Sequence, residues 1–349
     1  EIGSGLVGSE MCIRDSYIAI WFLLFITIYA GKAKTILVSS IFCILVFLYS
    51  FRGIDVGVDT STYYDIFCSI SSGADLEYLE PLWKVLNKLV VGIGGNFNLL
   101  LFFSSLLMLV PVFYVVYTYS INPALSLYIY YSMYFFCGSL NISRQYLAIS
   151  FILCSFCFFK SYPFRAFCCF MIALGFHLSS VFIVLIIPFL YVNISRKKAL
   201  ISLFFSFGIG TFLTKSLTQI ILSFLYQGYA ERDLFRTEDT GLPFVIAMNI
   251  FYVCVFLIAD KLLLNSKWGK LYLFSALVLN LVYPLELGTR LYNIFSISNL
   301  LFYPLLLINN RLKMKKVVEC IIIVFFACMF FRMISSNANE VFPYEFAVY

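Results

Sequence analysis

The sequence predicts an all-α protein that crosses a lipid bilayer many times, and three observations support this fold class. Of the 349 residues, 62% are hydrophobic and only 12% are charged, whereas a soluble domain carries about 25% charged residues. The apolar residues form runs close to the length of about 20 residues that a membrane helix needs. Lysine and arginine gather in the short loops between those runs, as they do in the cytoplasmic loops of membrane proteins. A compact water-soluble fold is therefore not expected.

Ten apolar segments are expected to form the membrane helices. Each is bounded by charged or polar residues, and each approaches the length that spans the hydrocarbon layer as a helix. They cover residues 17–31, 35–51, 97–117, 123–138, 144–159, 199–225, 242–264, 270–285, 290–308 and 317–334. The fold class is thus a polytopic helical bundle of about ten transmembrane helices.

A further apolar run, residues 164–192, is broken in its middle by Gly175, Phe176 and His177. Basic residues stand on both sides of this run, and loops rich in basic residues should share the cytoplasmic side, so the run needs an even number of crossings. We therefore expect two short limbs that form a re-entrant hairpin with His177 at its tip. Irregular backbone at that depth must be buried in protein or line a wet cavity.

The distribution of charge orients the helices. Five basic loops should be cytoplasmic, and they contain Lys32 and Lys34, Lys160 and Arg165, Arg196 to Lys198, Lys261 to Lys270, and Arg311 to Lys316. Nearly all of the remaining acidic residues then fall in loops on the opposite side. Two of these outer loops stand out, residues 52–96 and 227–241. The first contains a segment with helical apolar periodicity, 79–91, which we expect to form a helix at the membrane interface.

The chain is expected to form a single transmembrane domain over residues 17–335, followed by an extracytoplasmic tail, 336–349. Residues 1–16 lack the pattern of a signal peptide, and we expect a non-native or disordered leader there. The 11 cysteines lie mostly in apolar segments, where a thiol packs as a small hydrophobe, so no disulfide framework is expected. The basic residues form no stripe interleaved with aromatic residues, so no nucleic-acid partner is expected.

Ionisable side chains at the ends of apolar helices are costly and are therefore candidates for a functional site. Arg52 follows the second segment and is joined by Asp55, Asp59 and Tyr63, which together offer an anion clamp and a ring for stacking on a sugar. In an ordinary polar loop, Arg52 would instead pair with one of the two acids. Glu80 opens the interfacial segment, where the helix dipole alone could account for a carboxylate.

Further candidates lie later in the chain. Arg144 and Gln145 begin the fifth segment, no acid near in sequence neutralises Arg144, and a guanidinium binds phosphate bidentately. His177 is the only histidine and can exchange a proton near neutral pH, although a lone histidine is often only a hydrogen-bonded part of the structure. Glu286 and Arg290 lie on the polar faces of two successive segments, where they either line a cavity or form an ion pair across the turn.

The order of these motifs resembles that of the EpsG family, bacterial polysaccharide polymerases of the Wzy type. The resemblance runs from about Arg52 to the C-terminus. It rests on Arg52-Gly53, Gly57-Val58-Asp59, Tyr63, Glu80-Pro81-Leu82, Asn141-Ile142-Ser143-Arg144-Gln145-Tyr146-Leu147-Ala148, Gly175-Phe176-His177-Leu178-Ser179, Arg290-Leu291-Tyr292 and Pro343-Tyr344.

The resemblance implies a GT-C-like bundle in the bacterial inner membrane, which joins glycan units carried on undecaprenyl diphosphate at the outer face. The lipid bilayer and the lipid-linked glycan are the implied partners, and a chain-length regulator is a further candidate. The resemblance assigns the diphosphate to Arg144 and Arg290, with Arg52 as a third candidate. Substrate binding extends to Gln145, Tyr63 and Glu286.

The resemblance also implies a base that deprotonates the acceptor hydroxyl, and His177 is the first choice before Asp59 and Glu80. No cofactor is expected. No required metal is expected either, because Asp55 and Asp59 supply fewer oxygens than a hard cation usually needs.

Two other functions remain open from the sequence. A flippase or transporter of lipid-linked sugars would bind diphosphate with the same arginines, but it would need a polar path to the cytoplasmic face, and the inner halves of the predicted helices are almost wholly apolar. A membrane O-acyltransferase also uses a histidine, normally within a helix that faces a thioester tunnel. An assay with an acyl donor would separate that activity from glycosyl transfer.

Overall fold

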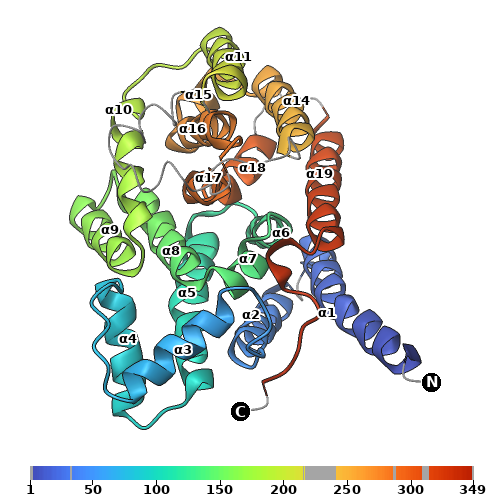
Figure 1. Cartoon of the computed structure of the whole chain (residues 1–349). Helices are drawn as coiled ribbons and strands as arrows, with labels where there is room; N and C mark the ends of the chain where they lie inside the picture. Colours follow the sequence, from blue (N-terminus) through green and yellow to red (C-terminus); the bar gives the residue numbers. More distant parts are fainter. Residues whose placement is uncertain are drawn as a thin grey trace. The chain divides into compact units, whose positions relative to one another are not determined.

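The computed structural model describes residues 3–31, 34–214, 216, 241–285, 288–308 and 314–347. Over these ranges the chain has 17 α-helices and no strand, so the predicted all-α class is confirmed (Figure 1). The residues cluster in two compact units, Glu1–Ser180 with Lys316–Tyr349 (unit 1) and Val181–Lys315 (unit 2). Each unit is described by itself below. The single transmembrane domain over residues 17–335 stays a prediction.

Every apolar segment that the sequence predicts in unit 1 contains at least one helix. Its helices are α1 Gly3–Tyr29, α2 Lys34–Ser50, α3 Thr60–Ser71, α4 Pro81–Gly92, α5 Phe97–Tyr119, α6 Pro123–Ser132, α7 Phe135–Asn141, α8 Ser143–Phe158, α9 Pro163–Phe176 and α19 Lys315–Ser335. Helix α1 starts at Gly3, so residues 3–16, expected to be a non-native or disordered leader, are helical. Whether those residues are native to the chain is a separate prediction that stays open.

One predicted helix of unit 1, residues 123–138, is interrupted. Helix α6 begins at Pro123, a favoured residue for a first turn, after Asn122, whose side-chain oxygen accepts from the backbone N–H of Leu125. It ends before Tyr134, whose φ of 67° is left-handed and cannot continue a right-handed helix. The Tyr134 hydroxyl donates to the Ala338 carbonyl at 2.9 Å. The break between α6 and α7, which the apolar pattern does not predict, therefore coincides with a contact to the C-terminal segment.

Residues 52–96, predicted to be an outer loop, contain two helices. Helix α4 matches the predicted interfacial segment, with Pro81 in its first turn and with Trp83, Asn87 and Val90 buried at helical spacing. Helix α3 was not predicted. It packs against α4, and the rings of Tyr63 and Trp83 are 5.3 Å apart between centroids. Two short helices therefore form a layer within unit 1, next to α5 and α9.

The predicted break at Gly175, Phe176 and His177 is confirmed. Helix α9 ends at Phe176, and His177 is extended, with φ −158° and ψ 119°. A 3₁₀ helix, Leu178–Leu185, follows it directly. The apolar run is thus two short limbs joined at the only histidine, as the sequence indicates. Its re-entrant position in a membrane stays a prediction.

Unit 2 consists of shorter helices, and a single residue, Ser266, separates two of them, α15 and α16. They are α10 Ile186–Phe189, α11 Arg196–Phe212, α14 Leu242–Ile258, α15 Lys261–Asn265, α16 Lys267–Val282, α17 Gly288–Ser296 and α18 Asn299–Leu307. The predicted helix over 242–264 breaks at Asp260, whose carboxylate accepts from the backbone N–H of Leu263 at 2.7 Å. Helices α11 and α16 pack so closely that a Cβ on Gly210 would lie 1.7 Å from the Asn280 carbonyl oxygen.

Helix length supports fewer membrane crossings than the sequence predicts. Among the described helices, α5 with 23 residues and α19 with 21 residues are long and apolar enough to cross a bilayer. Six other apolar helices have 10–17 residues, and at 1.5 Å per residue a helix of that length falls short of a hydrocarbon layer about 30 Å thick. The number of about ten crossings therefore does not follow from the helices themselves.

Candidate active site

Three candidate residues predicted from separate parts of the sequence meet in unit 1. Glu80, the residue before α4, accepts a hydrogen bond from Arg144 at the start of α8 through its Oε2 atom. Its Oε1 atom lies 3.1 Å from Nδ1 of His177, the residue after α9. Glu80, Arg144 and His177 are called the Glu80 cluster below. One carboxylate thus holds a guanidinium and an imidazole at one place.

The cluster depends on the close approach of α4 to α9, which lie side by side (Figure 1). Gly175 stands two residues before His177, and Leu82 stands two residues after Glu80. A Cβ on Gly175 would lie 2.6 Å from Cγ of Leu82, so the absence of a side chain lets the two helices come together. This contact aligns the beginning of α4 with the end of α9.

The Glu80 cluster is partly open to solvent. The side chains of Glu80, His177 and Arg144 are 17%, 21% and 27% exposed, so a ligand can reach them while most of their surface is covered. Burial by itself raises the pKa of Glu80, but the hydrogen bond with His177 and the charge of Arg144 act in the other direction, and the pKa lies below its ordinary value of 4.5. Glu80 is therefore an anion at neutral pH.

The ionised state of Glu80 decides how His177 binds it. A carboxylate only accepts hydrogen bonds, so Nδ1 of His177 carries the hydrogen that points to Oε1. In the neutral ring, Nε2 is then the nitrogen that can accept a proton. The pair has the orientation of a histidine base held by an acidic partner.

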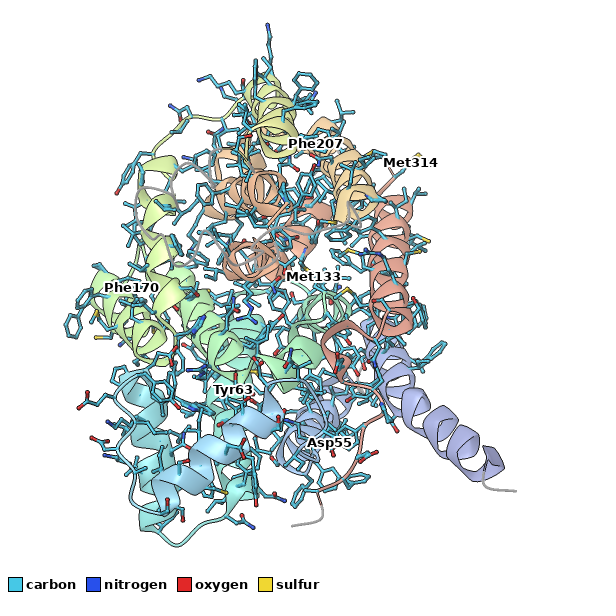
Figure 2. All side chains as sticks on the ribbon, viewed as in Figure 1. Asp55, Tyr63, Met133, Phe170, Phe207 and Met314 are labelled. Atoms are coloured by element: carbon cyan, nitrogen blue, oxygen red, sulfur yellow. The ribbon has the colours of Figure 1, made fainter. Side chains whose placement is uncertain are left out.

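The ring of Tyr63 contacts the guanidinium of Arg144 in the cluster. The guanidinium carbon of Arg144 is 5.6 Å from the centroid of the Tyr63 ring, within the range of a cation–π contact. Tyr63 is 2% exposed, and Figure 2 shows it on α3. Burial raises the pKa of Tyr63 to about 12, so its phenol is neutral. The ring expected to stack on a sugar is instead covered and carries Arg144.

Arg52 is fully buried and connects two helices. Its Nη1 atom donates to the Tyr49 carbonyl at 2.8 Å, and its Nη2 atom donates to the Ser143 hydroxyl at 3.1 Å. The guanidinium carbon also lies 4.1 Å from the centroid of the Tyr49 ring. Arg52 therefore joins the end of α2 to the start of α8, and its predicted contact with diphosphate would require this side chain to move.

Asp59 belongs to a tight loop before α3. Its backbone N–H donates to the side-chain oxygen of Asn141 at 2.7 Å, and the hydroxyl of the next residue, Thr60, donates to the Leu140 carbonyl at 3.0 Å. The loop is thereby fixed to the end of α7, directly before α8. Asp59 is half-buried, and it stays the alternative candidate for the base.

The C-terminal segment, residues 340–345, also forms hydrogen bonds with the loop before α3. The backbone N–H groups of Gly53 and Gly57 donate to the carbonyls of Glu345 and Glu340 at 2.7 and 2.9 Å, and the Tyr344 hydroxyl donates to the Leu48 carbonyl at 2.8 Å. Residues predicted to be an extracytoplasmic tail therefore pack against residues 48–57. The sequence analysis did not predict this packing role.

Replacing Gly57 by alanine is expected to destabilise the loop beside the cluster. Gly57 has a φ of +86°, and a Cβ there would lie 2.8 Å from the Leu140 carbonyl oxygen. Gly73→Ala is the matched control, because Gly73 has a φ of +93° and open space around it. Both changes introduce left-handed strain of about 1–2 kcal/mol, and only Gly57→Ala adds a clash with backbone. Thermal unfolding in detergent should show a larger fall in Tm for Gly57→Ala; equal shifts would contradict the close contact.

The EpsG family model matches residues 35–346, which is most of the chain. The chain belongs to the EpsG family. No curated protein and no solved structure matches it. The family is associated with exopolysaccharide synthesis, and the matched residues contain the whole Glu80 cluster, the loop before α3 and the segment that holds this loop.

The other predicted residues of this EpsG family member are buried, belong to unit 2 or fall outside the described residues. Gln145 follows Arg144 but is buried, at 1% exposure. Arg290 is half-buried on α17, in unit 2, so a joint role of Arg144 and Arg290 on one diphosphate stays a prediction. Glu286 lies outside the described residues. Asn280 on α16 is fully buried and binds Asn249 and Ser206.

Two further observations on this EpsG family member concern possible metal ligands and the partner of Arg144. Among the residues that the structure describes, no group of three or more His, Cys, Asp or Glu side chains could hold a metal ion. The absence of an acid near Arg144 in the sequence is misleading, because Glu80 reaches it from 64 positions away. Sequence spacing carries no signal of that pairing.

Proposed function

We propose that this protein is a glycosyltransferase that polymerises undecaprenyl-diphosphate-linked oligosaccharide units. The observation that carries the proposal is the Glu80 cluster, in which a histidine that can take a proton and an arginine that can bind phosphate share one carboxylate. Membership of a family associated with exopolysaccharide synthesis supports the same conclusion.

The proposed reaction uses each residue of the cluster in a different way. His177 accepts the proton of the acceptor hydroxyl through Nε2 while that oxygen attacks the anomeric carbon of the donor sugar. A new C–O bond forms, the C–O bond to the diphosphate breaks, and undecaprenyl diphosphate leaves with the electron pair. Arg144 stabilises the negative charge that grows on the leaving diphosphate.

The low pKa of Glu80 favours His177 over Glu80 as the base. A carboxylate whose pKa is below 4.5 is a weak proton acceptor at neutral pH, and a general base works best when its pKa is near the working pH. Glu80 is better suited to fix the ring of His177 and its tautomer. Asp59 remains the second candidate for the base.

The proposed setting is the bacterial inner membrane, with about ten crossings in a GT-C-like bundle and with the cluster open to the outer face. Support comes from apolar side chains that face outward: Phe164 on α9 and Phe204 and Phe212 on α11 are 77%, 75% and 78% exposed. Large exposed apolar surfaces indicate contact with a membrane or a partner. A chain-length regulator as partner belongs to the same proposal.

The chain-length distribution of surface glycan tests the function. Cells that carry the protein should make long polymers, and cells without it should display single repeat units on the surface. Loss of all surface units, with lipid-linked units trapped inside, would indicate a flippase and overturn the proposal. Loss of acyl groups on a polymer of unchanged length would indicate an O-acyltransferase.

A further inference from the structure

The carboxylate of Glu80 contacts Arg144 and His177 at the same time. Its Oε2 atom is bound to Arg144 and its Oε1 atom lies 3.1 Å from Nδ1 of His177. A diphosphate that binds Arg144 bidentately uses two N–H groups of the planar fork, and Glu80 already accepts from one of its two terminal nitrogens, Nη1. Ligand and carboxylate therefore compete for the same arginine.

We propose that Glu80 is an exchangeable counter-ion, which an incoming diphosphate displaces from Arg144 and which then binds His177 alone. This inference rests on the proposed function for the identity of the ligand, a lipid-linked or free diphosphate. It assigns Glu80 a positioning role that the sequence does not indicate.

The surroundings of the cluster allow such an exchange. Arg144 rests on the ring of Tyr63, 5.6 Å from its centroid, so the guanidinium keeps its place when its carboxylate partner leaves. Tyr63 itself is fixed by its burial against Trp83. Glu80 precedes the first turn of α4 and makes no side-chain capping bond. Its side chain can therefore turn toward His177 without breaking the helix.

The exchange links donor binding to the base. While Glu80 neutralises Arg144, part of its charge is unavailable to His177. Once diphosphate takes its place, the whole carboxylate orients His177 and stabilises the cation that forms when the ring accepts a proton. The base is then fully positioned only when a donor is bound, which disfavours wasteful proton transfer in the empty site.

The affinity for inorganic pyrophosphate and for undecaprenyl diphosphate in detergent tests the exchange. Glu80→Gln should bind both probes about 5- to 10-fold more tightly than the wild type, because Arg144 loses its competitor. The same variant should turn over more slowly, because His177 loses its anionic partner. A residue that only maintains the fold would lower affinity and turnover together, and that result would overturn the proposal.

Two variants separate exchange from simple repulsion between Glu80 and the ligand. In an Arg144→Ala background, Glu80→Gln should give no gain in affinity, whereas repulsion would give the same gain with or without Arg144. Asp75→Asn is the matched control, because it removes another carboxylate of the same outer loop, one that is 61% exposed and paired with Lys84 and Lys88. It should change affinity by less than about twofold.

A measurement on the wild type covers the case in which Glu80→Gln fails to fold. His177 is the only histidine, so a nitrogen NMR spectrum of labelled imidazole reports on one ring. Pyrophosphate should shift the Nδ1 signal in the wild type and leave it unchanged in Arg144→Ala. No shift in the wild type at saturating pyrophosphate would overturn the exchange. A protein that shows the shift and the affinity gain but transfers no sugar would contradict the proposed function alone.

Discussion

Replacing His177 with alanine should lower the rate of polymer formation by about 10²- to 10⁴-fold, the contribution typical of a general base. The imidazole is held 3.1 Å from the Glu80 carboxylate, which leaves Nε2 to take the proton of the acceptor hydroxyl. The methyl side chain of alanine cannot accept a proton, and the change leaves Glu80 and Arg144 in contact. The rate of polymer growth should be measured with purified protein and a lipid-linked repeat unit.

The matched comparison is His177→Gln, whose amide can still donate to Glu80 but cannot accept a proton near neutral pH. It should be as inactive as His177→Ala while binding diphosphate like the wild type. This outcome would separate the loss of the base from a loss of structure. A near-normal rate in either variant would move the role of base to Asp59 or Glu80.

Replacing Arg144 with alanine should abolish polymer and leave single repeat units on the cell surface. The change removes the predicted ligand of the leaving diphosphate, and removal of one oxyanion-stabilising donor alone costs about 10²- to 10³-fold in rate. It also leaves Glu80 without its guanidinium partner and uncovers the ring of Tyr63. Arg144→Lys should retain a small part of the activity, because an ammonium keeps the charge but not the planar fork.

Arg165→Ala is the matched control for Arg144. Arg165 also lies over a tyrosine ring, 4.7 Å from the centroid of Tyr162, but it belongs to a loop predicted to be cytoplasmic. Its removal should leave polymer length unchanged at equal protein levels. Long polymers in the Arg144→Ala strain at normal protein levels would show that Arg144 does not hold the diphosphate.

The helices of this protein were predictable because their signal is local. Apolar runs and polar caps place the ends of α2, α5, α8 and α19 within a few residues of those observed. The breaks at Tyr134 and Asp260 escaped prediction because apolar residues continue through or close to them. Helix α3 escaped it too, although its buried residues Tyr63, Ile66, Phe67 and Ile70 have the i, i+3, i+4, i+7 spacing of an amphipathic helix. The helix is only 12 residues long and lies in a segment rich in polar residues.

The residues of the candidate site could be predicted from the sequence, but the contacts between them could not. An ionisable residue in an apolar chain stands out by type, which is why Glu80, Arg144 and His177 could be named separately. Their convergence depends on the packing of α4 against α9 and on partners 64 and 97 positions apart in the sequence. Arg52 was also named by its residue type, but its predicted role differs from its observed contacts. It was expected to bind an anion in a loop, and it is buried and connects α2 with α8.

We propose that the Glu80 cluster carries out glycosyl transfer from a lipid diphosphate. The proposed transfer can be measured with the purified protein in lipid vesicles, supplied with one undecaprenyl-diphosphate-linked repeat unit, with free undecaprenyl diphosphate and glycan length measured together. We expect one undecaprenyl diphosphate released for each unit added, and neither product with His177→Ala or Arg144→Ala. Binding of the donor by the wild type without release of undecaprenyl diphosphate, or equal release by the variants, would contradict the claim.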